Sequence, residues 1–475
     1  MVMVGNTNSR NLIISASIWN FVGIFLLKSL AFITVPILTR LMSPTDYGIV
    51  STYATYISFL GIIIGLCLNT ASTNARIDFS ERYNEYNSSI IKASIVIFIL
   101  EIIIANLFYE YYAKILSISR LDLNIVFIIA YAEYIIATYY KINAVDFKFK
   151  NNLKISLTNA MISVGLSILL ISNLENDILA RLLGQGAFAL FIAIYLYYLI
   201  GVKRAKYFAF SDITYALKIA IPNIFHQISN MIMSQSDRVF ILSICGAVSV
   251  AKYSVVYNFG LIMQMVWNAI NDVWVPWLYR ALHDNKKDLI LKMSKIYLYV
   301  FTFLTSIAMI IIPDCMILFA PASYFDAKKL IPPVILATYF VFLYSFFANI
   351  EIYNKKNKFM AIATFVAAIF NIAGNAVFIP KYGYEAAAYT TLVAYILLMG
   401  MHYWCLTFLI KKNIYPIRMF IPPIMYMVGV SIYVTIFIDK IWQRYIGLIL
   451  ILVWVGFSMY RKKEMFKKFI KALWR

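Results

Sequence analysis

Apolar blocks about 20–25 residues long follow one another from Ile13 to Tyr460, and only short polar gaps separate them. About 20 apolar residues, rising 1.5 Å each as a helix, cross the roughly 30 Å of hydrocarbon in a bilayer. Lipid offers no hydrogen-bond partner to the backbone, so each block is expected to be helical. The pattern predicts an all-α polytopic membrane protein.

The blocks predict about fourteen transmembrane helices. The expected spans are 13–38, 47–69, 90–112, 123–145, 155–173, 178–200, 213–243, 253–279, 292–312, 330–354, 359–379, 384–409, 416–438 and 441–460. The least distinct division lies at Leu174–Asp177, between the fifth and sixth spans. An even number of spans puts both termini on one side of the membrane.

Composition agrees with this class of protein. The chain is 62% hydrophobic and 13% charged, whereas soluble domains are about 25% charged. A net charge of +20 is typical of many nucleic-acid-binding proteins. Here, however, the basic residues are distributed over alternate loops rather than one face, so no nucleic acid is expected as a partner. The four cysteines are far apart, which predicts neither a metal site nor a disulfide framework, and no cofactor is indicated.

The distribution of Lys and Arg predicts the orientation. Strongly basic gaps occur at 148–154, 203–206, 286–295, 355–358 and 411–418, and a basic tail covers 461–475. Because basic loops stay in the cytoplasm, both termini are expected there. The tail could also lie flat on anionic membrane lipids, although an ordinary topology signal explains most of its charge.

Two segments carry distinctive turns. Residues 38–48 read LTRLMSPTDYG, in which Ser43-Pro44 predicts a tight exit from the membrane, Asp46 is placed to cap the next helix, and Gly48 permits close packing. Residues 370–388 read FNIAGNAVFIPKYGYEAAA and combine a polar, small-residue helix face with a Pro-Lys-Tyr-Gly turn. That face contains Asn371, Gly374 and Asn375.

With Ile221-Pro222 and Ser236-Asp237-Arg238 between them, these segments resemble the polysaccharide or O-antigen flippases of the multidrug/oligosaccharidyl-lipid/polysaccharide exporter superfamily. The resemblance covers most of the chain. It implies two six-helix bundles, 13–200 and 213–410, around a cavity that opens alternately to each side. Two further helices at 416–460 and a cytoplasmic tail at 461–475 would follow.

The resemblance also implies the cargo and the location. The cargo would be an oligosaccharide repeat unit on a polyprenyl pyrophosphate, for O-antigen or a related surface polysaccharide, as in lipopolysaccharide. It would move from the cytoplasmic to the periplasmic leaflet of a bacterial inner membrane, and other polysaccharide assembly proteins are potential partners. Substrate-contacting positions vary within this family, so no residue role is transferred.

Charges inside the predicted spans favour transport independently. A charged side chain at bilayer depth costs about 2.5–3.5 kcal/mol and is tolerated mainly in a wet cavity or in a pair. Lys28, Glu101 and Glu133 fall near the middle of their spans. Others lie nearer an end: Lys141, Arg181, Lys218, His226, Asp237, Arg238, Asp272 and Glu351.

Cationic donors are needed for the phosphates of such a cargo. The candidates for contacting it are Lys28, which is the first choice, and Lys141, Arg181, Lys218 and Arg238. The candidates for ion coupling or charge pairing are Glu101, Glu133, Asp237 and Asp272.

Structural alternatives remain open for several of these residues. Lys28 could pair with Glu101 or Glu133 merely to orient helices. Asp237 and Arg238 could form a pair at the outer end of a helix. His226, four residues after Pro222, is explained as well by a core position as by a functional one.

Other functions fit the sequence less well. A membrane polysaccharide polymerase, ligase or glycosyltransferase usually needs a sizeable extramembrane segment, and the longest gap here is Thr70–Ser89. The sequence shows no nucleophile–base pair or phosphate-cradling glycine loop, so the chain is expected to be a transporter rather than an enzyme. A cation-coupled multidrug exporter of the same superfamily is the principal alternative. A purely structural scaffold would leave the midplane charges unexplained.

Overall fold

The computed structural model describes residues 32–411 and 414–461, together with Gly23, Leu26 and Leu30. Throughout these residues the chain is helical and has no β-strand. It divides into two compact units, Met1–Ala251 and Lys252–Arg475. The predicted all-α fold is confirmed.

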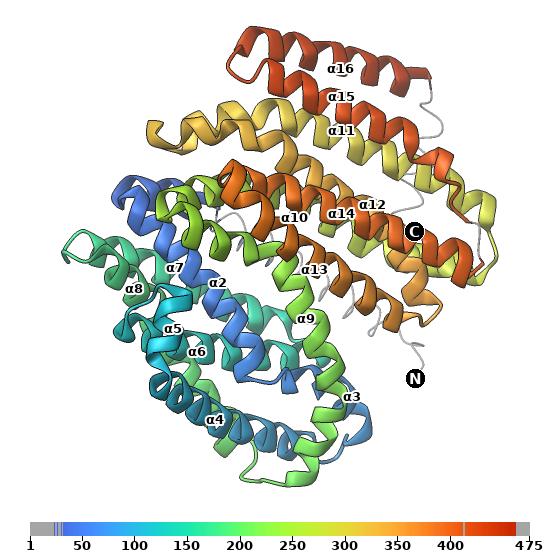
Figure 1. Ribbon diagram of the computed structural model, residues 1–475. Helices are drawn as coiled ribbons and strands as arrows, with labels where there is room; N and C mark the ends of the chain where they lie inside the picture. The colour runs from blue at the N-terminus through green and yellow to red at the C-terminus, as the bar shows by residue number, and fades with distance from the viewer. Residues whose placement is uncertain (1–22, 24–25, 27–29, 31, 412–413, 462–475) are drawn as a thin grey trace. The chain divides into compact units, whose positions relative to one another are not determined.

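A short apolar helix, Phe32–Leu41, comes first in the continuously described part of the first unit. Its later helices are α2 (Pro44–Ile64), η1 (Leu68–Ala71), α3 (Ser72–Asp78), α4 (Tyr83–Leu107), α5 (Tyr109–Leu116), α6 (Arg120–Val145), α7 (Phe149–Ile171), α8 (Asp177–Tyr198), η2 (Leu199–Lys203) and α9 (Phe210–Cys245). Figure 1 labels the longer ones.

The boundary between the units falls near the start of α10 (Ala247–His283). The helices that follow are α11 (Lys287–Phe319), η3 (Ala322–Leu330), α12 (Ile331–Tyr353), α13 (Asn357–Tyr382), α14 (Ala386–Trp404), η4 (Cys405–Leu409), η5 (Ile417–Met419), α15 (Ile421–Ile436) and α16 (Ile441–Arg461). Because α9 lies in the first unit, the observed units differ from the limits expected for the two bundles, which stay a prediction.

Ten helices in the described part of the chain are long and apolar enough to cross a membrane. They are α2, α4, α6, α7, α11 and α13, and α8, α12, α14 and α15 with their adjoining η segments. With 36 and 37 residues, α9 and α10 are longer but more polar, and Phe32–Leu41 and Ile441–Trp454 are shorter apolar helices. The chain is therefore a multi-pass membrane protein, and the count of about fourteen spans stays a prediction.

The SPTDYG turn has a different cap from the expected one. Ser43, not Asp46, is the N-cap residue of α2, and its hydroxyl oxygen accepts a hydrogen bond from the Asp46 backbone N–H at 3.1 Å. Pro44 occupies the first position of the helix, where a backbone N–H would have no partner within the helix. The residue before it, Ser43, is therefore the N-cap. The Ser43 hydroxyl donates in turn to the Asp46 carboxylate at 2.6 Å. The expected close approach at Gly48 is confirmed, because a Cβ there would overlap the Ala247 carbonyl oxygen.

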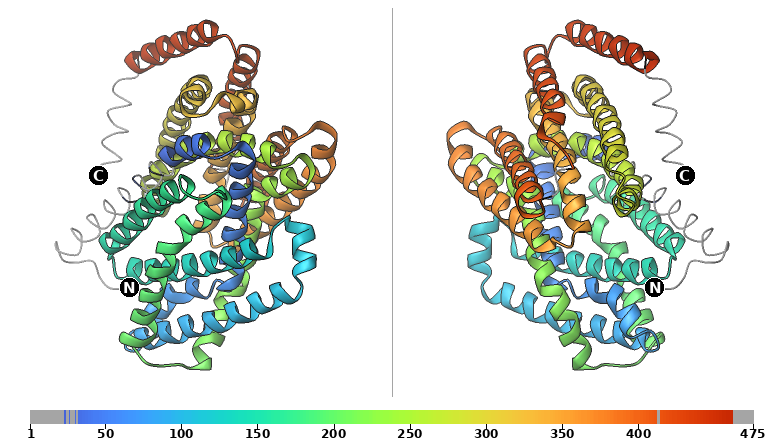
Figure 2. Two further views of the ribbon diagram at one scale, coloured as in Figure 1. Left: turned by 90° about the vertical axis from the view of Figure 1, so that its left-hand side faces the viewer. Right: turned by 90° about the vertical axis from the view of Figure 1, so that its right-hand side faces the viewer.

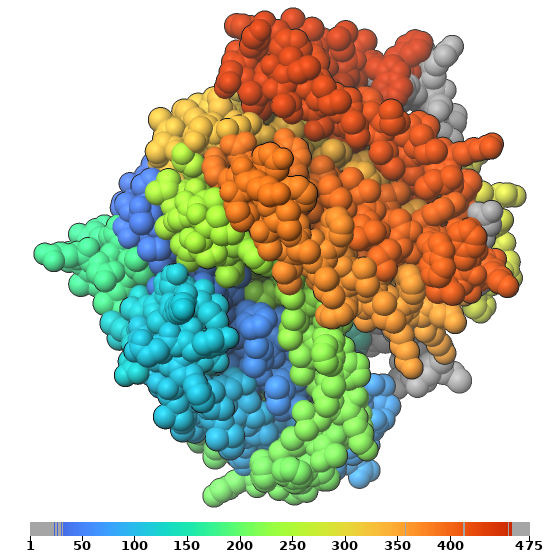
Figure 3. Space-filling model, viewed as in Figure 1, coloured from blue at the N-terminus to red at the C-terminus, as the bar shows by residue number. Residues whose placement is uncertain are grey.

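The expected span 90–112 was misplaced. α4 already begins at Tyr83, because polar residues of its first two turns are buried and hydrogen-bonded rather than solvated. The Ser88 hydroxyl donates to the Tyr207 carbonyl at 2.8 Å, and the Ser89 hydroxyl donates to Asp212 at 2.9 Å. The separate helix α5 has no buried residue and lies on the surface of the first unit (Figure 3).

Each unit has its own central helix. In the first unit α6 packs against α2, α7 and α8, whereas in the second α12 packs against α11, α14 and α15 (Figure 1). Almost every side chain of α12 is buried, which fits its uniformly apolar sequence. Its aromatic residues stack on α11, for example Phe342 on Phe301 with centroids 4.1 Å apart. The final hairpin of α15 and α16 also packs against α11 (Figures 1 and 2).

Candidate functional site

A polar cluster lies among the membrane-spanning helices of the first unit. Glu133 is at the middle of the 26-residue α6, as expected from the sequence. Its Oε1 accepts a hydrogen bond from the Gln185 Nε2 on α8 at 3.2 Å, and the Glu133 side chain is exposed to a water-sized probe. The carboxylate therefore has a neutral hydrogen-bonding partner within a helix that is long and apolar enough to span a membrane.

Arg181 lies one helical turn from Gln185 on the same face of α8. Its Nη1 donates to the Ser167 hydroxyl on α7 at 2.6 Å, and that hydroxyl donates to the Ser163 carbonyl at 2.6 Å. The Arg181 Nε is buried and has no hydrogen-bond partner among the described residues. One donor of the guanidinium is therefore buried without a hydrogen-bond partner among the described residues.

Close packing of α7 and α8 makes the Arg181–Ser167 contact possible. A Cβ on Gly184 would lie only 2.5 Å from the Ser167 Cα. Only glycine allows this approach of the two backbones, which is the usual device of membrane helix pairs.

Charge attraction links the parts of this cluster. Arg181 lies within electrostatic range of Glu133 and of the Tyr47 hydroxyl on α2. A guanidinium, a carboxylate and an amide from neighbouring helices can bind a phosphate oxygen and sugar hydroxyls together. We call Glu133, Arg181 and Gln185 the interior polar cluster. Sequence analysis found Glu133 and Arg181 but missed Gln185, which a search at i+4 from Arg181 would have found.

The other cationic candidates of the first unit lie elsewhere. Lys28 is outside the described residues. Lys141 is half-buried near Cys67 and makes no ion pair within the described part of the chain. The Lys218 side chain on α9 is exposed. Neither Lys141 nor Lys218 joins the interior polar cluster by any hydrogen bond or ion pair.

Glu101 does not lie near the middle of its helix, contrary to expectation. α4 ends at Leu107, so Glu101 is in the last two turns. Its Oε2 is buried and has no hydrogen-bond partner among residues that the structure describes. The helix begins and ends earlier in the chain than the expected span 90–112, which explains the different position of Glu101 within it.

Asp237 and Arg238 are both buried within α9, with exposed fractions of 0% and 7%, and both have interaction partners. This burial argues against a solvent-exposed pair at a helix end. His226, on the same helix, is half-buried, and its Nε2 lies 3.0 Å from the Asn230 Nδ2 one turn later. The partner of His226 is therefore local.

In the second unit the two acidic candidates differ. The Asp272 side chain on α10 is exposed. Glu351 on α12 is buried, and its Oε2 lies 2.9 Å from the Nδ1 of His402 on α14. Sequence analysis missed His402. Its position near the same end of its span as Glu351 is the one signal that could have indicated the pair.

The small-residue face of α13 forms a buried network with α14. The Asn371 Nδ2 donates to the Thr391 hydroxyl at 3.0 Å, and the Asn375 Nδ2 donates to the Asn371 Oδ1 at 3.3 Å. The Thr390 hydroxyl donates to the Asn375 Oδ1. The motif noticed in the sequence therefore joins two membrane-spanning helices.

A partly buried ion pair that sequence analysis missed joins α11 to α16. The Arg444 Nη1 and Nη2 lie 3.0 and 2.5 Å from the two carboxylate oxygens of Asp314. The Nη1 also donates to the Ile310 carbonyl at 2.8 Å. Bidentate geometry of this kind fixes both side chains.

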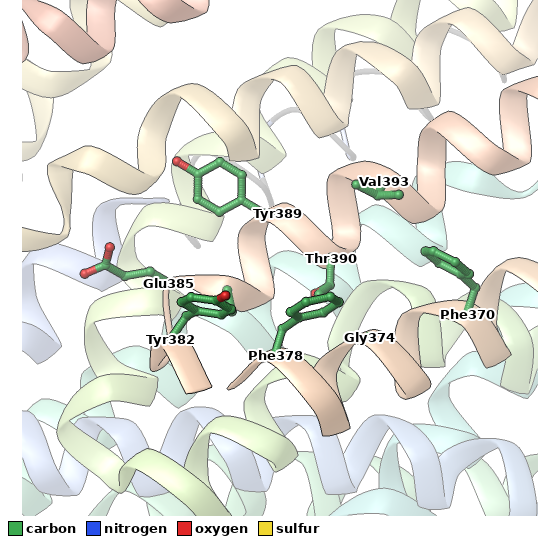
Figure 4. A pocket seen from close by; sticks show the side chains of 9 residues that line it. Phe370, Gly374, Phe378, Tyr382, Glu385, Tyr389, Thr390 and Val393 are labelled. Atoms are coloured by element: carbon green, nitrogen blue, oxygen red, sulfur yellow. The ribbon is translucent and has the colours of Figure 1, made fainter. Parts of the chain in front are cut away.

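An aromatic groove of about 500 Å³ runs between α13 and α14 (Figure 4). Its apolar walls include Phe370, Phe378, Tyr389 and Val393. Glu385 at one end pairs with Lys329, which leaves the groove without net charge. The groove suits an apolar chain rather than an anionic group.

The fold belongs to a known class of membrane proteins. The chain is similar to the lipid II flippase MurJ in an inward closed conformation, with a TM-score of 0.69 and 19% identity over 94% of this chain and 100% of that one. It is also similar to a mutant of the Vibrio cholerae MATE transporter VcmN, with a TM-score of 0.55 and 13% identity over 85% of this chain and 98% of that one. The architecture is therefore that of the flippase and multidrug exporter fold.

The sequence comparisons give the family. The polysaccharide biosynthesis protein family matches residues 13–282, more than half of the chain, so the chain belongs to that family. It is also 24% identical to Lsg locus putative protein 1 of Haemophilus influenzae over 374 residues, covering 75% of this chain and 89% of the relative. The resemblance to polysaccharide flippases drawn from sequence motifs is confirmed.

Proposed function

We propose that the protein is a flippase that moves a polyprenyl-pyrophosphate-linked oligosaccharide repeat unit, such as that of O-antigen or a related surface polysaccharide, across the bilayer. The proposal rests mainly on the interior polar cluster. A guanidinium donor and a carboxylate inside membrane-spanning helices match a cargo that carries phosphates and hydroxyls. The family and the fold support the same class of transport.

The proposed orientation follows from charge. The segments at 148–154 and 203–206 are basic, as are the later ones on the same side, so both termini lie in the cytoplasm of a bacterial cell. Transport then runs from the cytoplasmic to the periplasmic leaflet of the inner membrane. The inside-negative potential favours outward movement of an anion by roughly 2.3 kcal/mol per charge per 100 mV traversed.

In this proposal Arg181 binds a phosphate oxygen and Glu133 with Gln185 binds sugar hydroxyls. Lys28 is a further proposed phosphate contact, and the expectation that Lys28→Ala abolishes export stays a prediction. Alternating access would come from rocking of two bundles, 13–200 and 213–410, against each other. Partners would be the lipid-linked oligosaccharide, membrane lipids and other polysaccharide assembly proteins.

The test is deletion of the gene with analysis of surface glycan and of lipid-linked intermediates. A flippase predicts loss of surface glycan and accumulation of complete repeat units that face the cytoplasm. Complementation with Arg181→Gln should fail, while the protein inserts at a normal level. Units that cross the bilayer but remain unjoined would indicate a polymerase or ligase and would overturn the proposal.

A cation-coupled multidrug exporter is the second candidate, because MATE transporters share this fold. It predicts unchanged surface glycan in the deletion strain and increased sensitivity to cationic drugs. The two outcomes are measured in the same strain and exclude each other.

A further inference from the structure

A second, strongly polar pocket lies at one membrane end of the first unit. Its volume is about 410 Å³, within the range of roughly 300–1,000 Å³ typical of small-molecule sites. It is formed by α3, the start of α4, the end of α6 and the residue that follows η2. Three of its lining residues are cationic, namely Arg76, Lys148 and Arg204.

One carboxylate holds two of these cations side by side. The Asp146 Oδ1 lies 3.1 Å from the Arg76 Nε, and its Oδ2 lies 3.0 Å from the Lys148 Nζ. The chain reverses at Phe147, which has φ +58°, and the Lys148 N–H donates to the Asn143 carbonyl at 2.8 Å. This left-handed turn after α6 brings Lys148 back to Asp146. Because a non-glycine residue in this conformation is strained, the surrounding contacts must hold the turn.

Arg204 has a different environment. The π-helical segment η2 adds a residue to the last turn after α8, and the Arg204 N–H donates to the Leu199 carbonyl at 3.0 Å. The guanidinium lies over the Tyr139 ring, 5.6 Å from its centroid. It makes no ion pair with a carboxylate in the described part of the chain. Its charge is therefore free to act in the pocket, and π-helical turns of this kind often occur at functional sites.

The charges favour an anion. Asp146 is already shared between Arg76 and Lys148, and the Glu81 side chain at the rim is exposed. The pocket also includes the polar residues Ser80 and Asn84. A phosphate group would receive charge-assisted hydrogen bonds from arginine, whose planar guanidinium matches two phosphate oxygens at once.

The position of the pocket indicates a lipid as the source of that phosphate. α4 begins and α6 ends at the pocket, and both helices are long and apolar enough to span a membrane, so the pocket is expected near the level of the lipid phosphates. The aromatic groove of the second unit offers no comparable set of cations. A site at this depth can take a phosphate while the attached chain stays in the bilayer.

We propose that this pocket, named here the basic end pocket, binds the phosphate or diphosphate group of a lipid at the membrane surface. That this surface is cytoplasmic rests on the proposed function; the binding itself does not. If the lipid is the diphosphate cargo, the basic end pocket receives it before it reaches the interior polar cluster.

The test is calorimetric titration of the full-length protein in detergent. The probes are inorganic pyrophosphate, farnesyl diphosphate and dihexanoyl phosphatidylglycerol. Arg204→Gln should weaken binding of the preferred probe about tenfold or more, since a charge-assisted hydrogen bond contributes about 1.5–3 kcal/mol. Arg204→Lys should bind with an affinity between those of the wild type and Arg204→Gln, because it keeps the charge but not the planar donors.

Lys154→Gln is the matched control, since Lys154 is exposed on the neighbouring α7 and does not line the pocket. It should bind as the wild type does. Equal affinity of wild type and Arg204→Gln, or equal weakening by Lys154→Gln, would overturn the proposal. No binding of any probe by the folded wild type would overturn it too.

The three probes distinguish the source of the phosphate. Preference for farnesyl diphosphate over phosphatidylglycerol indicates a carrier lipid, whereas the reverse order indicates bulk phospholipid. Similar binding of pyrophosphate and both lipids at the same site indicates that the phosphate alone is recognised. Binding is measured without glycan, so the two tests are independent. If no probe binds, the flippase test of the deletion strain still stands. If the flippase test fails, a phosphate that binds at the basic end pocket still supports the pocket.

Discussion

The His402 Nδ1 lies 2.9 Å from the Glu351 Oε2 in the interior of the second unit, and the two side chains are only 1% and 0% exposed. The Tyr344 ring stacks on the imidazole with centroids 5.3 Å apart. The second atoms of the pair, the His402 Nε2 and Glu351 Oε1, have no hydrogen-bond partner among the described residues. Within the described residues, each of these two buried side chains therefore has the other as its hydrogen-bond partner.

Removing one member of this pair should destabilise the protein more than removing both. Glu351→Leu leaves a buried imidazole without its partner, and a stranded buried polar group costs about 1–3 kcal/mol. The double variant Glu351→Leu/His402→Leu removes both groups and should recover part of the loss. Thermal unfolding in detergent measures the difference. His283→Leu, at an exposed histidine, is the control, and a double variant less stable than either single one would contradict the argument.

Arg444 should hold the last helix in place. Breaking a fully buried ion pair costs about 3–5 kcal/mol, and because Asp314 is partly exposed the cost here should be smaller. Arg444→Gln is therefore expected to release α16 from α11, and amide hydrogen exchange in Ile441–Trp454 should become faster. Lys440→Gln changes an exposed cation one turn earlier and should leave the exchange rates as they are. Unchanged exchange in Arg444→Gln would show that apolar packing alone holds α16.

Gly184 and Gly165 offer a matched pair for testing the contact between α7 and α8. A methyl group at Gly184 meets the Ser167 backbone, whereas nothing lies within 4 Å of a Cβ at Gly165. Gly184→Ala is expected to lose about 1–3 kcal/mol of stability through overpacking and to weaken the Arg181–Ser167 hydrogen bond. Gly165→Ala should be neutral or stabilise the helix by up to about 1 kcal/mol. Thermal unfolding of both variants decides, and equal effects would refute the close approach.

Much of the fold could be predicted from hydropathy alone, because most of the apolar blocks in the described part of the chain correspond to one long helix each. The span expected at 123–145 corresponds closely to α6, so Glu133 lies near the middle of its helix as expected. The span expected at 90–112 was wrong because the first turns of α4 bury serines against the segment before α9 and α9 itself. Hydropathy cannot distinguish a buried polar turn from a loop.

The partners of the charged residues could not be predicted from one sequence. Gln185 and Ser167 are recognised as the partners of Glu133 and Arg181 only when it is known which faces of α6, α7 and α8 pack together. The pairing of Glu351 with His402 likewise depends on the register between two helices that are distant in the chain. Residue type and depth indicated which charges matter, and tertiary packing determines what each one contacts.

The charge links of Asp146 should make stability depend on pH. Burial raises the pKa of this carboxyl, but hydrogen bonds and attraction from Lys148 and Arg76 outweigh it and hold the pKa below its usual range. A carboxyl with a lowered pKa in the folded state contributes stability that is fully present above the unfolded-state pKa, about 3.9. The contribution is lost as the pH falls through the folded-state pKa.

The difference in unfolding temperature between wild type and Asp146→Asn should therefore be constant from about pH 7 to 5 and shrink below about pH 4. Lys148→Gln removes one of the two cations. At neutral pH the unfolding temperature of Lys148→Gln should therefore exceed that of Asp146→Asn by less than the wild-type value does. A wild-type advantage that stays constant through the acid range would show that the carboxylate charge contributes nothing.

The interior polar cluster makes the most direct prediction for transport. Arg181→Gln keeps a hydrogen-bonding side chain but removes the charge, so a phosphate-bearing cargo should lose its strongest contact there and surface glycan should disappear. Ser167→Ala removes the hydrogen bond that orients Arg181, together with the bond from the Ser167 hydroxyl to the Ser163 carbonyl, and should reduce export partially. Glu133→Gln keeps the shape of the side chain and tests whether the carboxylate charge is needed.

Lys114→Gln, at an exposed cation on the surface helix α5, is the control. Quantified surface glycan and membrane-protein level together measure the outcome, and wild-type glycan in an Arg181→Gln strain would exclude Arg181 from the transport path.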